Sequence, residues 1–193
     1  MLKVKSNFLR TGLICILIAF GCLFGYLMLQ NLCAELFICW GWEERSSMDE
    51  LFADGFWSAF MIIGVIFPVL EELIFRLGVC KLLQKFKLND WYVIIISAVV
   101  FMLYHGSWSQ VVYQLLMGIW LAWIYIKTRQ IGWTVLIHFI NNTFVITYTY
   151  LTGTGNEVFN LDAWSIILSL SLAVITTVAV VFLIKKGIPE YEK

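Results

Sequence analysis

Long hydrophobic segments without a formal charge alternate along the chain with short polar segments. A helix needs roughly 20 apolar residues to cross the ~30 Å hydrocarbon core of a bilayer, and several segments approach or reach that length. The candidate spans cover residues 11–34, 55–70, 91 to about 105, 111–126, 131 to about 151 and 163–184. The pattern predicts an all-α, polytopic membrane helical bundle of about six transmembrane helices, with residues 1–193 in a single membrane domain.

The basic residues fall on one side of these predicted spans. With the N-terminus inside the cell, the inner segments contain Lys3, Lys5, Arg10, Lys81, Lys85, Lys87, Lys127, Arg129, Lys185, Lys186 and Lys193. The outer segments contain Arg45 and a cluster of acidic residues between positions 43 and 54. Because cytoplasmic loops hold the excess of Lys and Arg, both termini are predicted to be cytoplasmic.

The composition excludes two classes of protein. The chain of 193 residues is 61% hydrophobic and 13% charged, whereas a soluble globular domain carries about 25% charged residues. The formal net charge is zero, so a basic nucleic-acid-binding surface is not expected and no nucleic acid is predicted as a partner. Membrane lipid is predicted to surround the chain and to be its partner.

A few polar residues interrupt the hydrophobic spans. Ionisable groups are costly in lipid, and they are therefore hypotheses for a functional site. They are Glu71, Glu72 and Arg76 after the second span, His105 at the end of the third, and His138, Asn141 and Asn142 in the fifth. The chain contains two histidines, and both belong to this set.

Helical geometry predicts how these side chains point. Residues four positions apart share a helix face, so Glu72 and Arg76 are expected to form an ion pair. Glu71 then projects about 100° away from that pair and faces a cavity. His138 and Asn142 are also four apart and are expected to project together, whereas the asparagine at position 141 points elsewhere and bridges or caps helices.

These groups suit more than one kind of chemistry. A carboxylate and an imidazole can together deprotonate water, while a second imidazole and an amide donate hydrogen bonds to an oxyanion. Such a set would hydrolyse an acyl bond without a covalent nucleophile. The same two histidines and one carboxylate could instead bind a metal. A proton or ion relay in a small transporter uses similar residues, and packing between helices is the non-functional alternative.

The depths of these residues constrain the third span. At ~1.5 Å per residue, Glu71 lies about 25 Å from the outer side, His138 about 10 Å from the inner side and His105 about 20 Å from it. The third span must therefore be tilted or begin near Asn89. Pro68, three residues before Glu71, has no amide hydrogen and is expected to loosen its helix. A shared water requires the Glu71 and His105 side chains to lie within about 10 Å of each other.

Three short patterns carry a family resemblance. They read Glu71-Glu72-Leu-Ile-Phe-Arg76, Phe101-Met-Leu-Tyr-His105 and His138-Phe-Ile-Asn-Asn142. Their order, spacing and hydrophobic setting resemble the CPBP family of CAAX proteases and bacteriocin-processing enzymes, also called the Abi family. The resemblance covers about residues 57–150, which it marks as a catalytic core with one extra helix at each end.

The resemblance implies an intramembrane endopeptidase that cuts a membrane-associated peptide or protein. By position, Glu71 resembles the family's catalytic glutamate, which activates water with His105. His138 and Asn142 resemble the pair that stabilises the oxyanion.

The resemblance also bears on cofactors. Glu72 and Arg76 match the supporting positions of the family motif. We favour glutamate-activated water without a cofactor. Zinc is the alternative, and it would be held by Glu71, His105 and His138.

The small size resembles bacterial members of the family. It implies a multi-pass integral protein of the bacterial cell membrane, with a role in bacteriocin processing or immunity. The alternative is a non-enzymatic protein, either an immunity or interaction partner or a small transporter.

Overall fold

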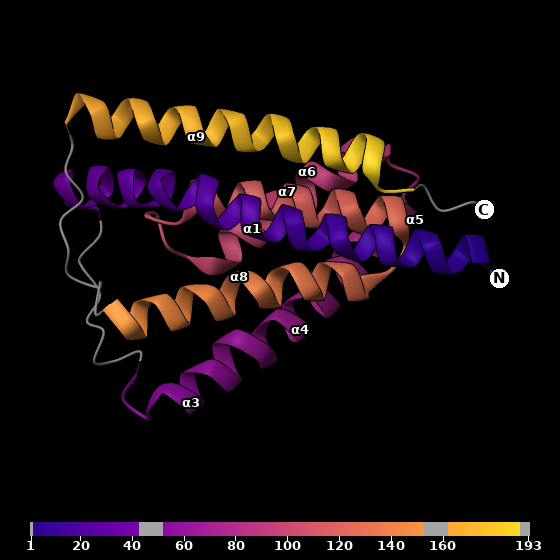
Figure 1. Ribbon diagram of the computed structural model, residues 1–193, viewed down its shortest axis with the longest axis horizontal. Helices are drawn as coiled ribbons and strands as arrows, with labels where there is room; N and C mark the ends of the chain where they lie inside the picture. The colour runs from indigo at the N-terminus through magenta and orange to yellow at the C-terminus, as the bar shows by residue number, and fades with distance from the viewer. Residues whose placement is uncertain (1, 43–51, 153–161, 190–193) are drawn as a thin grey trace.

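The computed structural model describes residues 2–42, 52–152 and 162–189, which form six long helical segments (Figure 1). Its elements are α1 (Leu2–Cys39), α3 (Phe56–Ala59), η1 (Phe60–Ile66), α4 (Phe67–Glu72), η2 (Leu73–Cys80), α5 (Lys81–Lys85), α6 (Asp90–His105), α7 (Val111–Thr128), α8 (Ile131–Thr152), α9 (Ala163–Phe182) and η3 (Leu183–Gly187). The elements α3 to α5 follow one another without a break and are called the α3–α5 rod, in which η1 and η2 are π-helical. The described residues contain no strand, so the predicted all-α fold is confirmed.

Four of the helical segments in the described ranges are long and apolar enough to cross a membrane. They are Phe8–Cys39, Phe56–Lys85, Val111–Thr128 and Ala163–Gly187. Of the other two, α6 is shorter, with 16 residues, and α8 has 22 residues but carries the polar residues of the fifth predicted span. The six segments correspond to the six predicted spans.

The predicted end of the second span at Leu70 is wrong, because the α3–α5 rod continues as helix to Lys85. The span was predicted to end at Leu70 because two charged residues, Glu71 and Glu72, follow directly. Both carboxylates are buried inside the bundle, so they do not have to lie at the membrane surface.

The third segment begins and ends as its sequence predicts. The side chain of Asn89 accepts a hydrogen bond from the Trp91 amide at 2.9 Å and caps the start of α6. At the other end Gly106 has φ 64°, a left-handed conformation that suits glycine and terminates the helix directly after His105. This places His105 in the last turn of α6.

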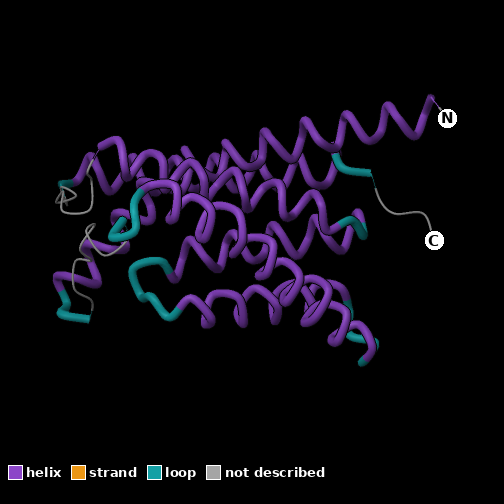
Figure 2. The backbone as a smooth tube through the Cα atoms, turned by 90° about the horizontal axis from the view of Figure 1, so that it is seen from below, coloured by secondary structure: helices purple, strands orange, loops and turns teal. Residues whose placement is uncertain are grey.

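The helices are arranged so that α8 lies between α1 and the α3–α5 rod (Figure 1). The first helix, α1, packs against α8 and α9, whereas the rod packs on α8 through η1 and α4 and on α6 through η2. Helices α6 and α7 form a closely packed hairpin. Helices α1 and α9, which are nearest the two chain ends, lie along the same side of the bundle (Figure 2).

The start of α1 and the end of η3 lie at the same end of the bundle (Figure 1). Arg10 Nη2 donates to the carbonyl oxygen of Lys186 at 3.3 Å and joins them directly. This is the arrangement that two cytoplasmic termini require. The assignment of that end to the cytoplasm stays a prediction from the distribution of Lys and Arg.

The interior holds two hydrophobic clusters, and the outer surface is apolar as well. The larger cluster joins α1, α7, α8 and α9, and the smaller one joins η2, α6 and α7. Large apolar side chains also cover the outside, such as Trp164, Val174 and Phe182 on α9. An apolar exterior around a packed interior is expected for a bundle surrounded by lipid.

Helix α9 is held against α1 by a close contact at a glycine. A Cβ added to Gly25 would overlap the side chain of Thr176. The neighbouring hydroxyls of Tyr26 and Thr177 lie 2.9 Å apart and are hydrogen-bonded. Small residues at such crossings let membrane helices approach closely.

We expect Gly25→Ala to lower the free energy of unfolding by about 1–3 kcal/mol, because the added methyl forces α1 and α9 apart. Gly21→Ala is the matched control, since no atom of the described residues outside its own helix turn lies within 4 Å of a Cβ at that position. It should leave stability unchanged or slightly raised, because alanine favours helix over glycine. Thermal unfolding of both variants in detergent micelles measures the difference, and equal melting temperatures would contradict the contact.

Candidate active site

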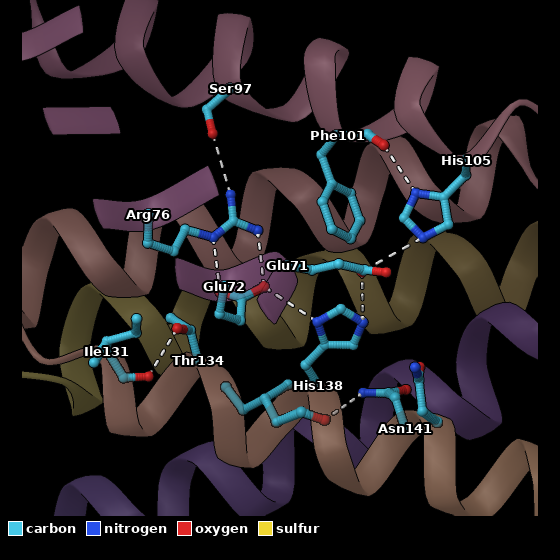
Figure 3. Close-up of polar contacts among 12 residues, drawn as sticks. Glu71, Glu72, Arg76, Ser97, Phe101, His105, Ile131, Thr134, His138 and Asn141 are labelled. Carbon is cyan, nitrogen blue, oxygen red and sulfur yellow. Dashed lines mark hydrogen bonds and ion pairs between the residues drawn. The ribbon is translucent and has the colours of Figure 1, made fainter. Parts of the chain in front are cut away.

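Three segments of the bundle bring the polar residues of the spans together (Figure 3). Glu71 and Glu72 end α4, and Arg76 lies one turn later in η2. His105 ends α6, and His138 lies in the first half of α8. The two glutamates, the arginine and His138 are buried, while the His105 side chain is 18% exposed. The cluster is therefore enclosed, and it is most open beside His105.

The ion pair predicted between Glu72 and Arg76 is confirmed. Arg76 Nε donates to Glu72 Oε2 at 2.8 Å, and Nη2 donates to Oε1 at 3.3 Å. The remaining nitrogen, Nη1, donates to Ser97 Oγ on α6 at 3.2 Å. The Phe101 ring lies beside the guanidinium, with its centroid 5.4 Å from Cζ. Forked contacts of this kind are the strongest way for an arginine to bind a carboxylate.

The Glu71 carboxylate lies between the two imidazole rings. Its Oε2 atom is 3.7 Å from His105 Nε2 and 3.6 Å from His138 Nε2. Both distances are far below the ~10 Å limit set by a shared water, yet both are longer than a hydrogen bond. Within the described part of the chain, this buried oxygen has no hydrogen-bond partner. Buried polar atoms without a partner are rare, and they are typical of sites that take up water or another ligand.

Both rings are oriented by a hydrogen bond at Nδ1. His105 Nδ1 donates to the carbonyl oxygen of Phe101 at 2.8 Å, and a carbonyl can only accept. His138 Nδ1 lies 3.2 Å from Glu72 Oε1 and donates to that carboxylate. The proton of each ring is therefore fixed on the side away from Glu71, and each Nε2 faces Glu71.

Asn141 bridges two helices, as predicted. Its Oδ1 accepts a hydrogen bond from the Tyr113 hydroxyl of α7 at 2.8 Å. Its Nδ2 donates to the carbonyl oxygen of Ile137 at 3.0 Å. Asn141 is thus used in packing α7 against α8.

The Asn142 amide has a partner that was not predicted from the sequence. Asn142 Nδ2 donates to the carbonyl oxygen of Ile63 in η1 at 2.9 Å. No described hydrogen bond joins Asn142 to the histidines or the glutamates of the cluster. The structure therefore brings five of the six predicted site residues into one cluster and places Asn142 against the rod beside it.

Pro68 in the α3–α5 rod explains why Asn142 bonds the carbonyl oxygen of Ile63. In η1 each amide bonds the carbonyl five residues earlier, and Phe67 N–H donates to Ile62 O in this way. The next amide in this pattern would bond Ile63 O, but it belongs to Pro68, which has no N–H. Asn142 supplies the missing donor. The predicted loosening of the helix near Pro68 thus takes the form of a π-helical segment held by α8.

Sequence reasoning missed two residues of this network. Ser97 and Tyr113 were not singled out, although both bond the polar residues of the spans. For Ser97 a signal was present, because Ser97, Phe101 and His105 are spaced four residues apart and share one face of α6. Tyr113 had no comparable signal.

The described residues show no group of three or more His, Cys, Asp or Glu side chains with the geometry to hold a metal ion. The zinc alternative, with Glu71, His105 and His138 as its donors, stays a prediction, as does glutamate-activated water without a cofactor.

Comparisons with known proteins point to one family. Residues 53–144 match the family described as Type II CAAX prenyl endopeptidase Rce1-like. A curated relative, putative membrane peptidase YdiL of Bacillus subtilis (strain 168), is 30% identical over 86 residues. That alignment covers 45% of this chain and 35% of the relative, so the chain spans about a third of the length of the curated relative. No solved structure matches the chain.

The family match includes every residue of the buried cluster. It leaves out α1, which packs against α7 and α8, and α9, which packs against α1. Four helical segments of the described chain can cross a membrane, and the relative is named a membrane peptidase. The protein is a multi-pass integral membrane protein.

A double-mutant cycle tests the link between Pro68 and Asn142. We expect Asn142→Ala to destabilise the protein, because the Ile63 carbonyl then has no donor. In a Pro68→Ala background the restored backbone amide can donate instead, so the same change should cost less. We expect a coupling of about 1 kcal/mol between the two sites, measured by thermal unfolding in micelles. Additive effects would show that the proline and the asparagine do not share this carbonyl.

Proposed function

We propose that the protein is an intramembrane endopeptidase, because residues 53–144 match the Rce1-like family of Type II CAAX prenyl endopeptidases. It hydrolyses a peptide bond of a membrane-associated peptide or protein. The chain covers only about a third of its curated relative, so this activity rests on the site's own chemistry as well as on the similarity.

The position of Glu71 Oε2 carries the proposal. This buried oxygen accepts no hydrogen bond from the described residues, and two imidazole nitrogens lie 3.6 and 3.7 Å away. A water molecule can sit within hydrogen-bond distance of the carboxylate and of His105 Nε2 at the same time. The His105 side is the more exposed side of the cluster, so water reaches the carboxylate from there.

In the proposed reaction, this water attacks the carbonyl carbon of the scissile peptide bond. Glu71 accepts one proton of the water, His105 Nε2 accepts a hydrogen bond that orients the water, and the carbonyl oxygen becomes an oxyanion. The tetrahedral intermediate then collapses, the carbon–nitrogen bond breaks, and the same proton passes to the leaving amine. The products are a carboxylic acid and an amine, and no covalent intermediate with the protein forms.

His138 is the proposed donor to the oxyanion. Its Nδ1 is committed to Glu72, so Nε2 can donate only when the ring carries a second proton. In that state the cluster contains two carboxylates, Glu71 and Glu72, and two cations, Arg76 and His138. Their formal charges cancel, which lowers the cost of burying them in a membrane protein.

Asn142 is the second proposed donor. Its amide nitrogen carries two hydrogens, and Ile63 O accepts one of them. The other remains for the oxyanion, on the same face of α8 as His138 and one turn away. Glu72 and Arg76 support the site by holding His138 in place.

The substrate class follows from the surroundings of the cluster. Exposed apolar side chains flank it on the rod and on α6, among them Leu70, Ile74, Leu103 and Tyr104. In a bilayer these surfaces face lipid, so an apolar peptide segment can approach the site from the membrane. The family description names CAAX prenyl substrates. For this chain we propose the broader class of membrane-associated peptides, including bacteriocin precursors.

We expect Glu71→Gln to reduce cleavage at least ~100-fold, because glutamine cannot accept the proton of the attacking water. Membrane peptides from cells that produce the wild type or the variant are compared by mass spectrometry. Glu35→Gln is the matched control, since Glu35 is an equally buried glutamate in α1 outside the cluster, and it should leave the products unchanged.

A folded Glu71→Gln protein that yields the same peptides as the wild type would contradict the peptidase. If that variant also kept its biological effect, it would favour the non-enzymatic alternative, an immunity or interaction protein or a transporter.

Removal of metal ions gives a separate test. If Glu71 activates water without a metal, cleavage of the same peptides should stay within about twofold of the untreated rate after exhaustive chelation. A loss of activity that added Zn²⁺ restores would instead favour the metalloprotease alternative. Thermal unfolding of the treated protein controls for damage to the fold.

A further inference from the structure

Ser97 is a fully buried hydroxyl that lies next to the charged cluster but belongs to none of the three sequence patterns. It lies on α6, where its Oγ accepts a hydrogen bond from Arg76 Nη1 at 3.2 Å (Figure 3). The same oxygen accepts a second hydrogen bond from the thiol of Cys80 at 3.3 Å. One oxygen of α6 thus receives donors from two residues of η2.

The contacts around Arg76 show what this oxygen does. One edge of the guanidinium, Nε and Nη2, is bonded to Glu72. The Phe101 ring lies beside it. Ser97 Oγ is bonded to the end that points away from Glu72. The guanidinium therefore has a fixed partner on each side, and Ser97 sets its rotation about the side-chain axis.

The orientation of Arg76 passes to His138 through one shared atom. Glu72 Oε1 accepts hydrogen bonds from both Arg76 Nη2 and His138 Nδ1. A turn of the guanidinium moves this carboxylate oxygen and changes the hydrogen bond that orients the imidazole. A continuous series of contacts thus runs from Ser97 through Arg76 and Glu72 to His138.

We propose that Ser97 is a positioning residue, which fixes the orientation of His138 through Arg76 and Glu72. Its part in catalysis rests on the endopeptidase proposed above, whereas its effect on His138 does not. Since hydrocarbon offers no replacement acceptor, an Arg76 N–H that loses Ser97 must find another partner inside the bundle. Arg76 then shifts, and the His138 hydrogen bond to Glu72 weakens.

The two histidines of the chain make this effect measurable without a substrate. The full chain is labelled with nitrogen-15 histidine, purified through a tag without histidine and studied by NMR in micelles. A His105→Gln variant assigns the signals of His138. The readout is the exchange rate of the His138 Nδ1 proton with water, which rises when its hydrogen bond weakens.

Four variants distinguish the effect of the Ser97 hydroxyl from the effect of the side chain's size and shape. Ser97→Ala and Ser97→Val remove the acceptor, and both should raise the exchange rate about tenfold. Ser97→Thr has nearly the shape of the valine variant but keeps the hydroxyl, and it should stay close to the wild type. Ser169→Ala is the control, because Ser169 is equally buried but donates only within α9, to the carbonyl of Ser165 at 2.7 Å.

The outcomes decide the proposal in each case. A His138 signal that is unchanged in Ser97→Ala and Ser97→Val would overturn it. Equal changes in Ser97→Thr and Ser97→Val would also overturn it, because the hydroxyl would then not be the acting group. A wild-type His138 without a protected Nδ1 proton would remove the hydrogen bond on which the proposal depends.

An activity measurement then separates this proposal from the proposed function. The peptides that disappear with Glu71→Gln should also form about tenfold more slowly with Ser97→Val, and at nearly the wild-type rate with Ser97→Thr. If Glu71→Gln has no effect on peptides, the endopeptidase fails, while the NMR result for Ser97 still stands or falls by itself. If Glu71→Gln abolishes cleavage and Ser97→Val does not slow it, the positioning role in catalysis fails alone.

Discussion

A polar group inside a bilayer must find its partner within the protein, because hydrocarbon supplies none. The forked pair of Arg76 and Glu72 is the main consequence of this constraint here. With both residues at zero exposure, the rod can pass through the hydrophobic interior without a break where the sequence places charges. The same pair supplies the carboxylate that orients His138 and the guanidinium that reaches α6. The site is therefore assembled around an ion pair that does not itself perform the proposed reaction.

The same constraint explains the less regular parts of the backbone. Pro68 deprives one carbonyl of its helical donor, and an asparagine of a neighbouring helix takes over. At the end of α6, His105 bonds a carbonyl of its own last turn. In both places a backbone carbonyl fixes the direction of a polar side chain of the cluster or beside it. Among the carboxylate oxygens of the cluster, Glu71 Oε2 has no hydrogen-bond partner in the described residues, and the proposed reaction rests on this atom.

The sequence predicted those features that depend on spacing within one helix. The ion pair of Glu72 and Arg76 follows from i, i+4 geometry, and the bounds of α6 follow from the length of its uncharged segment, and both were predicted. Contacts between helices were harder to foresee, because they depend on how each helix is rotated about its axis. The π-helical segment before Pro68 changes that rotation, so the Asn142 bond to Ile63 could not be predicted. The end of the second span was placed too early, since charge alone does not show whether a residue has a buried partner.

The contact between α1 and α9 has a consequence for how the protein is made. It joins Tyr26 to Thr177, which are 151 positions apart, and the helices that carry the charged cluster lie between them in the chain. During synthesis, α1 enters the membrane before the five further helical segments. The face of α1 that will contact α9 is therefore exposed to lipid until residue 177 has been synthesised. Helix α9 thus packs on α1 only after the helices that carry the cluster have been made, and Gly25 is the position at which that contact can be blocked.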